Sequence, residues 1–489
     1  MNAFDYFFSD SKILDKNFIL GVEEEASFHQ MYENSLTLAG YLTKNIGEDN
    51  KIILLSQNSV FFVTTYLAII KSGNICIPLN SSIEQSNLDY IVALTECKLS
   101  FLSKHIKSGL NISNSIITES DLEVILQQTQ NTKIKKSKVF DNNRIAEIIF
   151  TSGSTGVPKG VMLSHLNICT NTDSIVNYLK LTSNDIIEVV LPFFYCYGLS
   201  LLHTHLKVGA SVVLNNSFFL LGSVIEDLNK YKCTGFAGVP SHYQILLRKS
   251  QTFSKTFFPN LRYVTQAGGK LHNVFIEEFI EIFPEINFYV MYGQTEATAR
   301  LSYLQPELLK SKMGSIGKGI PGVTLMVLNE ENEPVQVGEV GELVAVGGNI
   351  MKGYLNDSEA TNEVLRDGRL YTGDLAIFDS DGYIYLVSRK KEIIKVGGNR
   401  VSPKEIEEVI LTVTEVIDCT VEGVDDNLLG ETIKATVILN GSYDKQEMEL
   451  KILKRCREKL ALYKIPRSIE FANHLNINST GKKTKFGPS

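Results

Sequence analysis

Apolar and polar stretches alternate near the amino terminus in an order that predicts a strand, a helix and a second strand. Residues 51–55 and 75–79 are short, almost wholly apolar runs, as buried strands are. Between them, an apolar stretch from about Ser59 to Lys71 is long enough for a helix, and Gly73 follows as a typical helix end. A strand–helix–strand unit favours parallel strands with helices against the sheet. The predicted fold class is therefore α/β.

The same pattern continues through the central part of the chain. Residues 148–150 are an apolar run that predicts a buried strand, and 186–191 predict another strand that ends at Pro192. Between residues 181 and 300, short apolar runs alternate with helical stretches. We therefore expect a large amino-terminal domain of parallel or mixed sheets flanked by helices.

The last hundred or so residues predict a small α+β domain. Residues 402–405, Ser-Pro-Lys-Glu, have the pattern of a capping box with proline at the first helical position. Apolar and polar residues alternate over 433–439, which predicts a half-exposed strand. The predicted buried helix positions are Ile406, Val409 and Ile410 in a first helix, and Met448, Ile452, Cys456 and Leu460 in a second.

Composition restricts the class of protein. The chain has 489 residues, which is too long for one compact core, so at least two domains are expected. It is 44% hydrophobic and 21% charged, an ordinary globular composition, and its net charge of −7 without a long basic run makes nucleic acid an unexpected partner. The seven cysteines include no C-x-x-C pair, which argues against a zinc site and favours a reducing compartment.

Targeting signals are not apparent in the sequence. The first residues lack the basic start of a signal peptide, and the most apolar stretch, 60–70, is far shorter than the ~20 residues that cross a bilayer. A cytoplasmic location without integral membrane association is expected. Nothing in the sequence indicates an oligomeric state.

A loop rich in glycine and hydroxyl residues follows the apolar run at 148–150. Residues 151–159, Thr-Ser-Gly-Ser-Thr-Gly-Val-Pro-Lys, expose backbone N–H groups and hydroxyls, and Lys159 adds a mobile cation beyond a proline. Such a loop suits an oligophosphate. It does not fit the P-loop pattern, because Lys159 is preceded by Pro158 and followed by Gly160.

Residues 150–165 resemble the phosphate-binding loop of the adenylate-forming superfamily, which includes acyl-CoA synthetases, luciferases and nonribosomal adenylation domains. Further motifs resemble the superfamily in the same order, and the matches extend from Phe150 to Lys482, about two thirds of the chain. The resemblance implies an amino-terminal adenylation domain at 1–387, a hinge at 388–391 and a mobile carboxy-terminal domain at 392–489. The run 317–322 fits G-x-G-x-x-G, but an apolar strand-like run follows it, so we interpret it as a structural turn.

The resemblance also implies a nucleotide site. Tyr292 would stack on adenine, Glu296 would bind Mg²⁺, and Asp374, which we expect on a turn after a strand, would accept the ribose hydroxyls. Lys482, Thr151 and Glu296 are the implied catalytic residues. The implied ATP-binding residues are Thr151, Ser152, Gly153, Ser154, Thr155, Gly156, Lys159, Gly268, Gly269, Tyr292, Gly293, Gln294, Thr295, Asp374, Arg389 and Lys482.

An acid-binding pocket is implied next to the nucleotide. Many acyl- and aryl-CoA ligases carry a histidine where this chain has Tyr195, and amino-acid-activating relatives carry an aspartate nearby. Residues 193–196, Phe-Phe-Tyr-Cys, supply no anion, which disfavours a free amino acid and favours an apolar acyl or aryl acid. The implied pocket residues are Tyr195, Tyr197, Gly198, Val239, Pro240, Ala267 and Gly268.

The carboxy-terminal motifs imply a moving domain. Lys391 occupies the hinge position, although Ser388 stands where the family usually has glycine. Gly397 and Gly398 would line a tunnel for the thiol substrate, since a narrow pantetheine arm can pass close to glycine backbone. Lys482 lies in a Thr-Gly-Lys turn, with further lysines at 483 and 485.

Together these features predict an AMP-forming acid–thiol ligase. A carboxylic acid, fatty or aryl, would react with ATP and Mg²⁺ to give an acyl-adenylate and pyrophosphate, and the acyl group would then pass to a thiol, expected to be that of CoA. An alternative acceptor is the phosphopantetheine of a carrier protein. A more distant alternative is an ATPase or kinase that uses residues 151–159 to release ADP.

Overall fold

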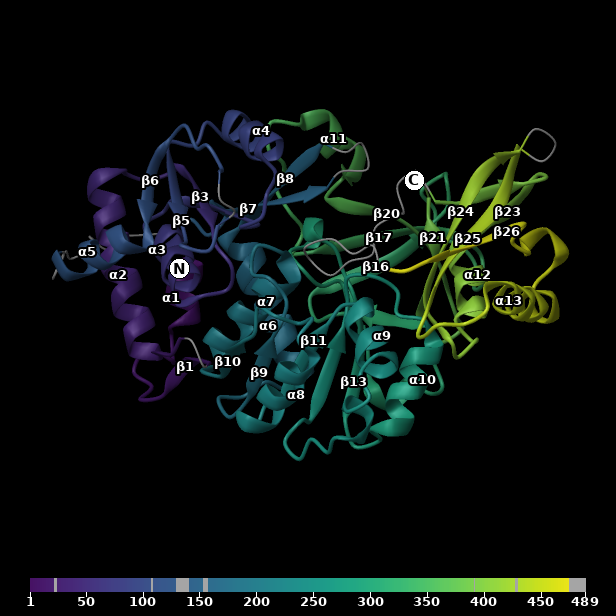
Figure 1. Cartoon of the computed structure of the whole chain (residues 1–489). Coiled ribbons are helices and arrows are strands. Elements are labelled where there is room, and N and C mark those ends of the chain that lie inside the picture. The colour runs from purple at the N-terminus through teal and green to yellow at the C-terminus, as the bar shows by residue number, and fades with distance from the viewer. Residues whose placement is uncertain are drawn as a thin grey trace.

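The computed structural model describes residues 1–21, 24–106, 109–128, 140–152, 157–390, 392–426 and 430–474. Three β-sheets organise these residues, and helices cover them (Figure 1). Two of the sheets belong to the part of the chain before residue 390, and the third is formed wholly by later residues. This confirms the predicted α/β class and the smaller carboxy-terminal unit. The boundaries at 388–391 remain a prediction.

A seven-stranded sheet contains the predicted strand–helix–strand unit. Its strands lie in the order β18 (Gly353–Tyr354), β8 (Pro158–Ser164), β7 (Ile145–Ser152), β4 (Ile75–Leu79), β3 (Lys51–Leu55), β5 (Leu99–Leu102) and β6 (Ser115–Thr118). Strands β3 and β4 are parallel, as expected, and helix α3 (Val60–Lys71) connects them. Ser59 precedes this helix and caps it by accepting a hydrogen bond from Phe62 N.

A fourteen-stranded sheet forms the rest of the large domain. Its order is β16 (Val323–Leu328), β17 (Gly341–Gly347), β20 (Arg369–Phe378), β21 (Ile384–Arg389), β15 (Ser315–Gly319), β14 (Ser302–Leu304), β13 (Asn287–Tyr292), β12 (Tyr263–Gln266), β11 (Gly235–Gly238), β9 (Ile186–Val189), β10 (Ser211–Leu214), β1 (Asn17–Leu20) and β2 (Ala26–Ser27), with β19 (Leu365–Arg366) beside β20. Strands β10, β9, β11, β12 and β13 run parallel to one another. The pairs β13–β14, β14–β15 and β15–β21 are antiparallel, so the sheet is mixed.

The structure corrects one predicted strand end in this sheet and confirms one predicted turn. Strand β9 ends at Val189 and not at 191, because the side chain of Asn58 bonds both the carbonyl of Leu191 and the N–H of Phe193 and so draws the chain out of the sheet. The glycine-rich run 317–322 lies in β15 and the turn before β16, with no helix after it. The interpretation as a structural turn is confirmed.

Helices pack between the two large sheets. Helices α1 (Ala3–Phe7), α2 (Phe28–Asn45), α3, α6 (His165–Leu179) and α7 (Cys196–Val208) share one core cluster with strand residues of both sheets, such as Ile52 and Val189 (Figure 1). The remaining helices of the large domain are α4 (Gln85–Thr95), α5 (Glu119–Gln128), α8 (Leu221–Lys230), α9 (Pro240–Arg248), α10 (Asn273–Ile282) and α11 (Ser358–Val364), with 3₁₀ turns η1 (Phe253–Lys255), η2 (Thr295–Ala297) and η3 (Pro306–Leu308).

The small unit is an α+β domain, as predicted. Its sheet has the order β23 (Asn399–Val401), β22 (Ile394–Val396), β25 (Gly430–Leu439) and β24 (Val416–Asp426), with β26 (Ser468–Ala472) on β25, and its helices are α12 (Pro403–Ile410), α13 (Lys445–Lys459) and η4 (Leu462–Lys464). Residues 406, 410, 448, 452 and 456 are buried as expected, whereas Val409 and Leu460 are half-buried or beyond the helix end. The capping box was wrong: the Ser402 hydroxyl donates to the Val387 carbonyl (2.8 Å) and makes no cap hydrogen bond.

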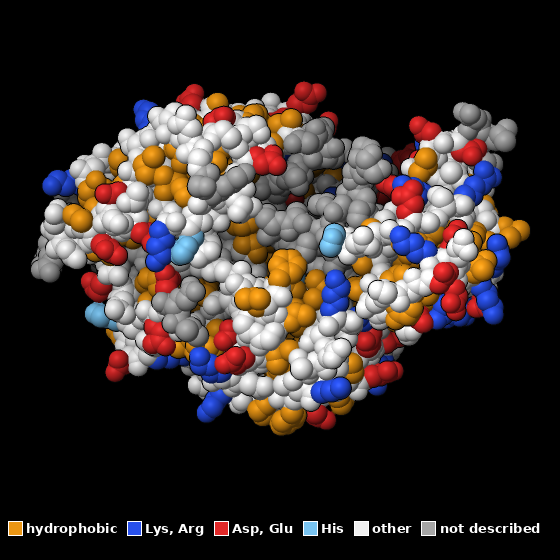
Figure 2. Space-filling model, viewed as in Figure 1, with side chains coloured by type: hydrophobic (Ala, Val, Ile, Leu, Met, Phe, Trp, Pro, Cys, Tyr) orange, Lys and Arg blue, Asp and Glu red, His pale blue; other side chains and the backbone are white. Residues whose placement is uncertain are grey.

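Surface charge is mixed in sign. On the face shown in Figure 2, Lys and Arg side chains alternate with Asp and Glu side chains and do not gather into one large patch of a single sign. None of the helices in the described part of the chain combines the length and apolar character that a bilayer crossing needs.

Candidate active site

Asp374 lies at the centre of one group of predicted nucleotide-binding residues. Its carboxylate accepts a hydrogen bond from the Tyr292 hydroxyl (2.6 Å) and forms an ion pair with Arg389 Nε (3.1 Å). The prediction that Asp374 lies on a turn was wrong: it is in strand β20, directly opposite Arg389 of β21. Burial raises the pKa of Asp374, and Arg389 and Tyr292 act in the opposite direction. The Tyr292 ring is almost fully buried.

Glu296 lies at the centre of a second group. Its carboxylate accepts a hydrogen bond from the hydroxyl of Tyr354 (2.8 Å), which belongs to β18 at the edge of the seven-stranded sheet. The Lys159 ammonium lies over the same tyrosine ring, 5.1 Å from its centroid, and 3.9 Å from a carboxylate oxygen of Asp357. Burial and the neighbouring Glu296 carboxylate both raise the pKa of Tyr354, so its hydroxyl keeps its proton. One aromatic side chain therefore contacts both the predicted metal ligand and the predicted phosphate-binding lysine.

The loop that carries Glu296 is held in an unusual conformation. Thr298 has a φ of 65°, which is uncommon for a residue with a β-branched side chain. Its hydroxyl donates to the carbonyl of the buried Asn349 (2.7 Å), and the Asn349 amide donates in turn to the carbonyls of Ala297 (3.1 Å) and Arg300 (2.7 Å). A buried asparagine thus fixes the backbone on which the predicted metal ligand lies.

Two neighbouring positions in this loop fit an approaching ligand. A Cβ at Gly293 would lie 2.0 Å from the Ala299 carbonyl oxygen, so only glycine permits this tight path. The side-chain nitrogen of Gln294 is buried and has no hydrogen-bond partner among the described residues. Thr295, the next residue, contacts Cys196 through its hydroxyl (3.4 Å). An unsatisfied buried donor here is consistent with a polar group of a bound nucleotide.

The predicted phosphate-binding loop joins two antiparallel strands. Thr151 of β7 pairs with Lys159 of β8, so the lysine lies beside the start of the loop. The side chain of Ser152 and residues 153–156 lie outside the described residues, as do the hinge Lys391 and the predicted catalytic Lys482. Their implied roles remain predictions.

The predicted acid-pocket residues come together from neighbouring strands and helix α7. Tyr197 is buried in the first turn of α7, and its hydroxyl contacts the carbonyl (2.9 Å) and hydroxyl (2.8 Å) of Thr265 on β12. Tyr195 precedes the helix and is half-buried. A Cβ at Gly198 would lie 2.2 Å from the carbonyl oxygen of Pro192, so α7 begins in close contact with the chain before it.

The turns after β11 and β12 lie side by side. Strands β11 and β12 are parallel neighbours, and the N–H of Ala267 donates to the carbonyl of Gly238 (3.4 Å). Pro240 begins helix α9, and a Cβ at Gly269 would touch its ring at 3.4 Å. The predicted pocket residues Val239 and Ala267 are both buried in the cluster that contains Tyr197. These turns lie at the carboxyl ends of parallel strands, where ligands bind in open α/β sheets.

The predicted thiol-tunnel glycines form an exposed turn. Gly397 and Gly398 connect β22 and β23, and both have positive φ values of 54° and 82°. Such a two-residue hairpin turn favours glycine at both positions. The hairpin presents its backbone to solvent, so its contact with a thiol substrate remains a prediction.

No group of three or more His, Cys, Asp or Glu side chains within the described ranges could hold a metal ion. Glu296 is therefore a single carboxylate near Lys159 and Tyr354. A lone carboxylate fits a Mg²⁺ ion that arrives with nucleotide phosphates as its other ligands, which is how Mg²⁺ is usually bound.

Three residues of this region were missed by the sequence reasoning: Tyr354, Asn349 and Arg300. Tyr354 contacts Glu296, which is 58 positions away, and Asn349 holds Ala297, 52 positions away. Neither contact leaves a local pattern in the sequence. Arg300 had a local signal, because it stands four residues after Glu296 in an otherwise apolar and hydroxyl-bearing run.

Glu408 of α12 contacts the large domain. Its carboxylate accepts hydrogen bonds from the backbone N–H of Asn273 (2.7 Å) and from His272 (2.9 Å), and forms an ion pair with Lys270 (3.3 Å). These contacts lower the pKa of Glu408 to about 2 against the opposing effect of burial. Asn273 is the first residue of α10, so Glu408 caps that helix from another domain.

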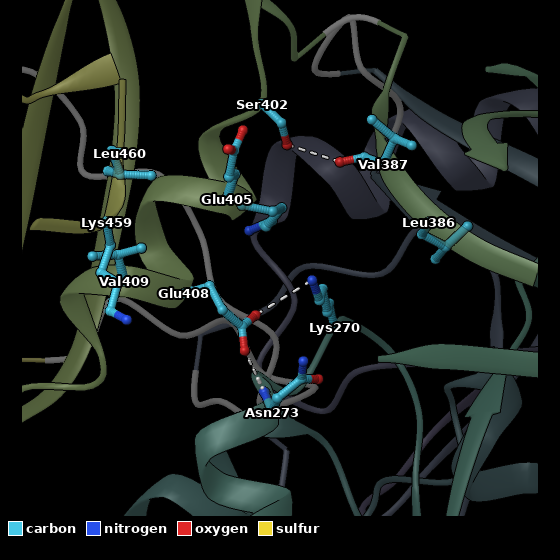
Figure 3. A pocket seen from close by; sticks show the side chains of 11 residues that line it. Lys270, Asn273, Leu386, Val387, Ser402, Glu405, Glu408, Val409, Lys459 and Leu460 are labelled. Carbon is cyan, nitrogen blue, oxygen red and sulfur yellow. Dashed lines mark hydrogen bonds and ion pairs between the residues drawn. The ribbon is translucent and has the colours of Figure 1, made fainter. Parts of the chain in front are cut away.

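A cavity of about 390 Å³ lies at this junction (Figure 3). Lys270, Asn273 and Leu386 line it from the large domain, and Glu405 and Glu408 line it from the small one. None of the predicted nucleotide-binding or acid-binding residues lines this cavity. The cavity therefore lies between the two domains, away from the candidate active site.

The sequence of this chain matches known protein families and is similar to known enzymes. Residues 10–355 match the AMP-binding enzyme family, and residues 405–482 match the AMP-binding enzyme C-terminal domain. The chain is 32% identical over 448 residues to oxalate–CoA ligase from Arabidopsis thaliana, and the aligned part covers 88% of this chain and 86% of that protein. It is 28% identical over 534 residues to a long-chain-fatty-acid–CoA ligase from Bacillus subtilis (strain 168), and the aligned part covers 97% of this chain and 91% of that protein.

The fold of this chain is also similar to that of a solved CoA ligase structure. The anthranilate CoA ligase AuaEII in complex with anthranoyl-AMP superposes with a TM-score of 0.91 and 25% sequence identity, over 99% of this chain and 95% of that chain. The protein therefore belongs to the AMP-binding enzyme family, as the resemblance of its motifs predicted.

Proposed function

We propose that the protein activates a carboxylic acid with ATP and transfers the acyl group to the thiol of CoA. One observation carries the proposal: two charged groups lie around the loop 292–296. Asp374 pairs with Arg389 in the first, and Glu296 and Lys159 both contact Tyr354 in the second. A pair suited to ribose hydroxyls and a pair suited to Mg²⁺ and phosphate would then lie at either end of one nucleotide. The curated relatives named above are CoA ligases, which supports this acceptor.

In the first step, an oxygen of the acid's carboxylate attacks the α-phosphorus of ATP. The bond between the α-phosphorus and the bridging oxygen breaks, and pyrophosphate leaves with the electron pair. Two anions must approach each other, so their repulsion is the main barrier. Lys159 offers one compensating charge, and we assign Lys482 to bridge the carboxylate and the α-phosphate. Bound Mg²⁺ would neutralise phosphate charge next to Glu296.

In the second step, the thiol sulfur attacks the carbonyl carbon of the acyl-adenylate. The carbon–oxygen bond to AMP breaks, AMP leaves, and the thiol proton passes to solvent. We propose that the small domain turns about Lys391 between the steps, which would remove Lys482 and bring the hairpin at Gly397 and Gly398 to the acyl group. The Glu408 contacts would break and form again during each turnover.

Pyrophosphate exchange identifies which carboxylic acid the enzyme activates. The enzyme is incubated with ATP, Mg²⁺, labelled pyrophosphate and single acids from short, medium, long-chain, aryl and amino acid classes. We expect exchange with at least one carboxylic acid and none with free amino acids. Transfer assays with CoA and with holo-carrier protein then identify the acceptor, and we expect CoA. Absence of acid-dependent exchange throughout, together with ADP formation, would contradict the proposal.

The role of Lys482 is tested by separating the two steps. Lys482→Ala should lower adenylate formation by roughly a thousandfold or more, because the positive charge assigned to it would stabilise the developing anion. Thioester formation from a supplied acyl-adenylate should be nearly unchanged. Lys483→Ala is the matched control and should retain both steps. Equal loss of both steps in Lys482→Ala would reject this assignment.

A further inference from the structure

Arg300 is a charged residue buried beside the candidate acid pocket. Its exposed fraction is 2%, and it is among the largest fully buried side chains in the described part of the chain. Its position is fixed, because the amides of Asn171 (3.1 Å) and Asn349 (2.7 Å) both donate to its carbonyl oxygen. It follows the Glu296 loop directly, so the two residues are placed by the same backbone.

Among the residues that the structure describes, no carboxylate pairs with the guanidinium of Arg300. Its Nε donates to the sulfur of Met291 (3.3 Å), a weak acceptor, and one Nη donates to the neighbouring Ala299 carbonyl (3.2 Å). The guanidinium also donates a hydrogen bond to the hydroxyl of the buried Tyr178, which is a neutral partner. None of the ion pairs formed by the described residues includes Arg300. The sequence outside those residues contains a single acidic residue, Glu23. Buried arginines are normally paired with an anion, because an uncompensated buried charge is costly.

The guanidinium of Arg300 lies against one residue of the predicted acid pocket. Its guanidinium carbon lies 4.1 Å from the ring centroid of Tyr197, and Tyr197 shares an apolar cluster with Val239 and Ala267. Tyr195 lies within the electrostatic reach of both Arg300 and Glu296: burial raises its pKa, Arg300 opposes this and Glu296 adds to it. Cys196, which lies between these two tyrosines, contacts Thr295 next to Glu296 (3.4 Å), so the start of α7 contacts both the Glu296 loop and Arg300.

We propose that the acid activated by this protein carries a second acidic group, a carboxylate, that pairs with Arg300. This proposal rests on the proposed function and narrows its substrate class to dicarboxylic acids. One carboxylate would meet the nucleotide near Glu296, and the other would receive the two parallel N–H groups that a guanidinium offers to a carboxylate. Apolar carbon between them would pack against the tyrosine rings.

The alternatives to a second carboxylate are weaker. An acid with a wholly apolar tail would leave the buried charge of Arg300 uncompensated. An acid with a distal ammonium group would place two like charges together in an apolar setting. The sequence-based expectation of an apolar acid considered only residues 193–196 and did not include Arg300.

The test uses matched pairs of acids with the full-length enzyme. The pairs are propionate and malonate, butyrate and succinate, hexanoate and adipate, and benzoate and terephthalate. Pyrophosphate release with ATP and Mg²⁺ gives kcat/KM for each. We expect the dicarboxylic member of the preferred pair to be favoured by roughly tenfold to a hundredfold, the range of a charge-assisted hydrogen-bonded pair.

Variants then assign this preference to Arg300. Arg300→Met should raise KM for the dicarboxylic acid by roughly tenfold or more, with little change in KM for ATP, and should abolish the preference over the matched monocarboxylic acid. Arg300→Lys should keep part of the preference, because it retains a charge without the guanidinium geometry. Arg366→Met is the control: this exposed arginine also lies over a tyrosine ring, that of Tyr371 at 3.6 Å, but it is remote from the acid pocket.

The outcomes separate this inference from the proposed function. Equal or better activation of the monocarboxylic acids by the wild-type enzyme would overturn the inference and leave the proposed function in place. An unchanged preference in Arg300→Lys and Arg300→Met would give Arg300 a structural role only, which also overturns it. Failure of every acid to release pyrophosphate would reject the proposed function itself. If Arg300→Met does not fold, the wild-type preference and Arg300→Lys still decide.

Discussion

Tyr354 shows how one side chain can connect two charges of opposite sign. Its hydroxyl donates to Glu296, and its ring lies under the Lys159 ammonium. A hydrogen bond to a charged group contributes about 1.5–3 kcal/mol. The hydroxyl thus orients the predicted metal ligand, and the ring holds the predicted phosphate-binding lysine.

Tyr354→Phe tests this arrangement at minimal structural cost. The variant keeps the ring under Lys159 and removes the hydrogen bond to Glu296, so we expect kcat/KM for Mg²⁺–ATP to fall by roughly tenfold or more. The dependence of the rate on Mg²⁺ concentration should shift to higher concentrations. Tyr371→Phe, which loses only a hydrogen bond to Asn332, is the control. An unchanged Mg²⁺ dependence would contradict the role given to Tyr354.

Asp374 provides a second test among single residues. Asp374→Ala removes both the acceptor of the Tyr292 hydroxyl and the partner of Arg389, and we expect KM for ATP to rise by roughly tenfold or more. Asp379→Ala removes a carboxylate from the nearby hairpin turn, where it pairs with Lys312, and should leave KM for ATP unchanged. Equal values of KM in wild type and Asp374→Ala would contradict ribose contact.

Among the elements, a buried polar contact joins strand β7 to helices α3 and α7. The hydroxyl of Tyr66 donates to Glu147 (2.7 Å) and contacts His203 Nε2 (2.8 Å), and all three side chains are buried. Burial raises the pKa of Glu147 to about 7, although the hydrogen bond from Tyr66 opposes the shift. Burial also lowers the pKa of His203 to about 3, so this histidine is neutral.

This contact predicts a pH dependence of stability. Between about pH 4.5 and 7, native Glu147 holds a proton that the unfolded chain has released, so the free energy of unfolding falls as pH rises. The fall from this group amounts to about 3 kcal/mol and ends above its native pKa. Glu147→Gln resembles the protonated form and should gain stability relative to wild type between pH 5 and pH 8.

Urea unfolding at several pH values measures this effect. The exposed Glu285 supplies the control, since Glu285→Gln should follow the wild-type curve at each pH. If the difference in unfolding free energy between Glu147→Gln and wild type were the same at pH 5 and pH 8, Glu147 would not titrate in this range in the native protein.

The elements also show what sequence can and cannot predict here. The strands β3 and β4 and the helix α3 followed from apolar runs, because nearly all of their side chains are buried. The predicted capping box does not form, because the Ser402 hydroxyl donates instead to the carbonyl of Val387 on strand β21. Asp374 lies in a strand although its local sequence, with Gly373 beside it, is typical of a turn.

The candidate site was predicted where a motif is contiguous in sequence. The motif at 292–296 and the residues Asp374 and Arg389 could be named in advance, and the structure brings Tyr292, Asp374 and Arg389 into contact. Contacts between distant segments, such as that between Tyr354 and Glu296, depend on the packing of two sheets and could not be named. The charge of Arg300 was visible in the sequence, but its burial was not.

At the scale of the whole molecule, a helix cap is one of several contacts that join the two domains. Glu408 of the small domain accepts the N–H of Asn273 at the start of α10, where the helix dipole favours a negative charge. Its lowered pKa means that this contact is fully present above about pH 4.5 and weakens as pH falls towards 2. Protonation of Glu408 therefore does not weaken this contact at neutral pH.

Glu408→Ala tests whether this cap holds the domains together. Removing a cap costs about 1 kcal/mol, so the amides in the first turn of α10 should exchange with deuterium roughly fivefold faster. Glu405→Ala, which breaks an ion pair with Lys464 inside the small domain, should leave exchange at α10 unchanged. Unaltered exchange in Glu408→Ala would show that other contacts hold the interface.

The central claim is that an oxygen of the acid attacks the α-phosphate of ATP, and an isotope follows this oxygen directly. The enzyme is given ATP, Mg²⁺, CoA and an active acid labelled with ¹⁸O in its carboxyl group. The account predicts one ¹⁸O atom in each AMP formed, with unlabelled pyrophosphate as the other phosphate product. Label in orthophosphate with formation of ADP, or AMP without label, would contradict it.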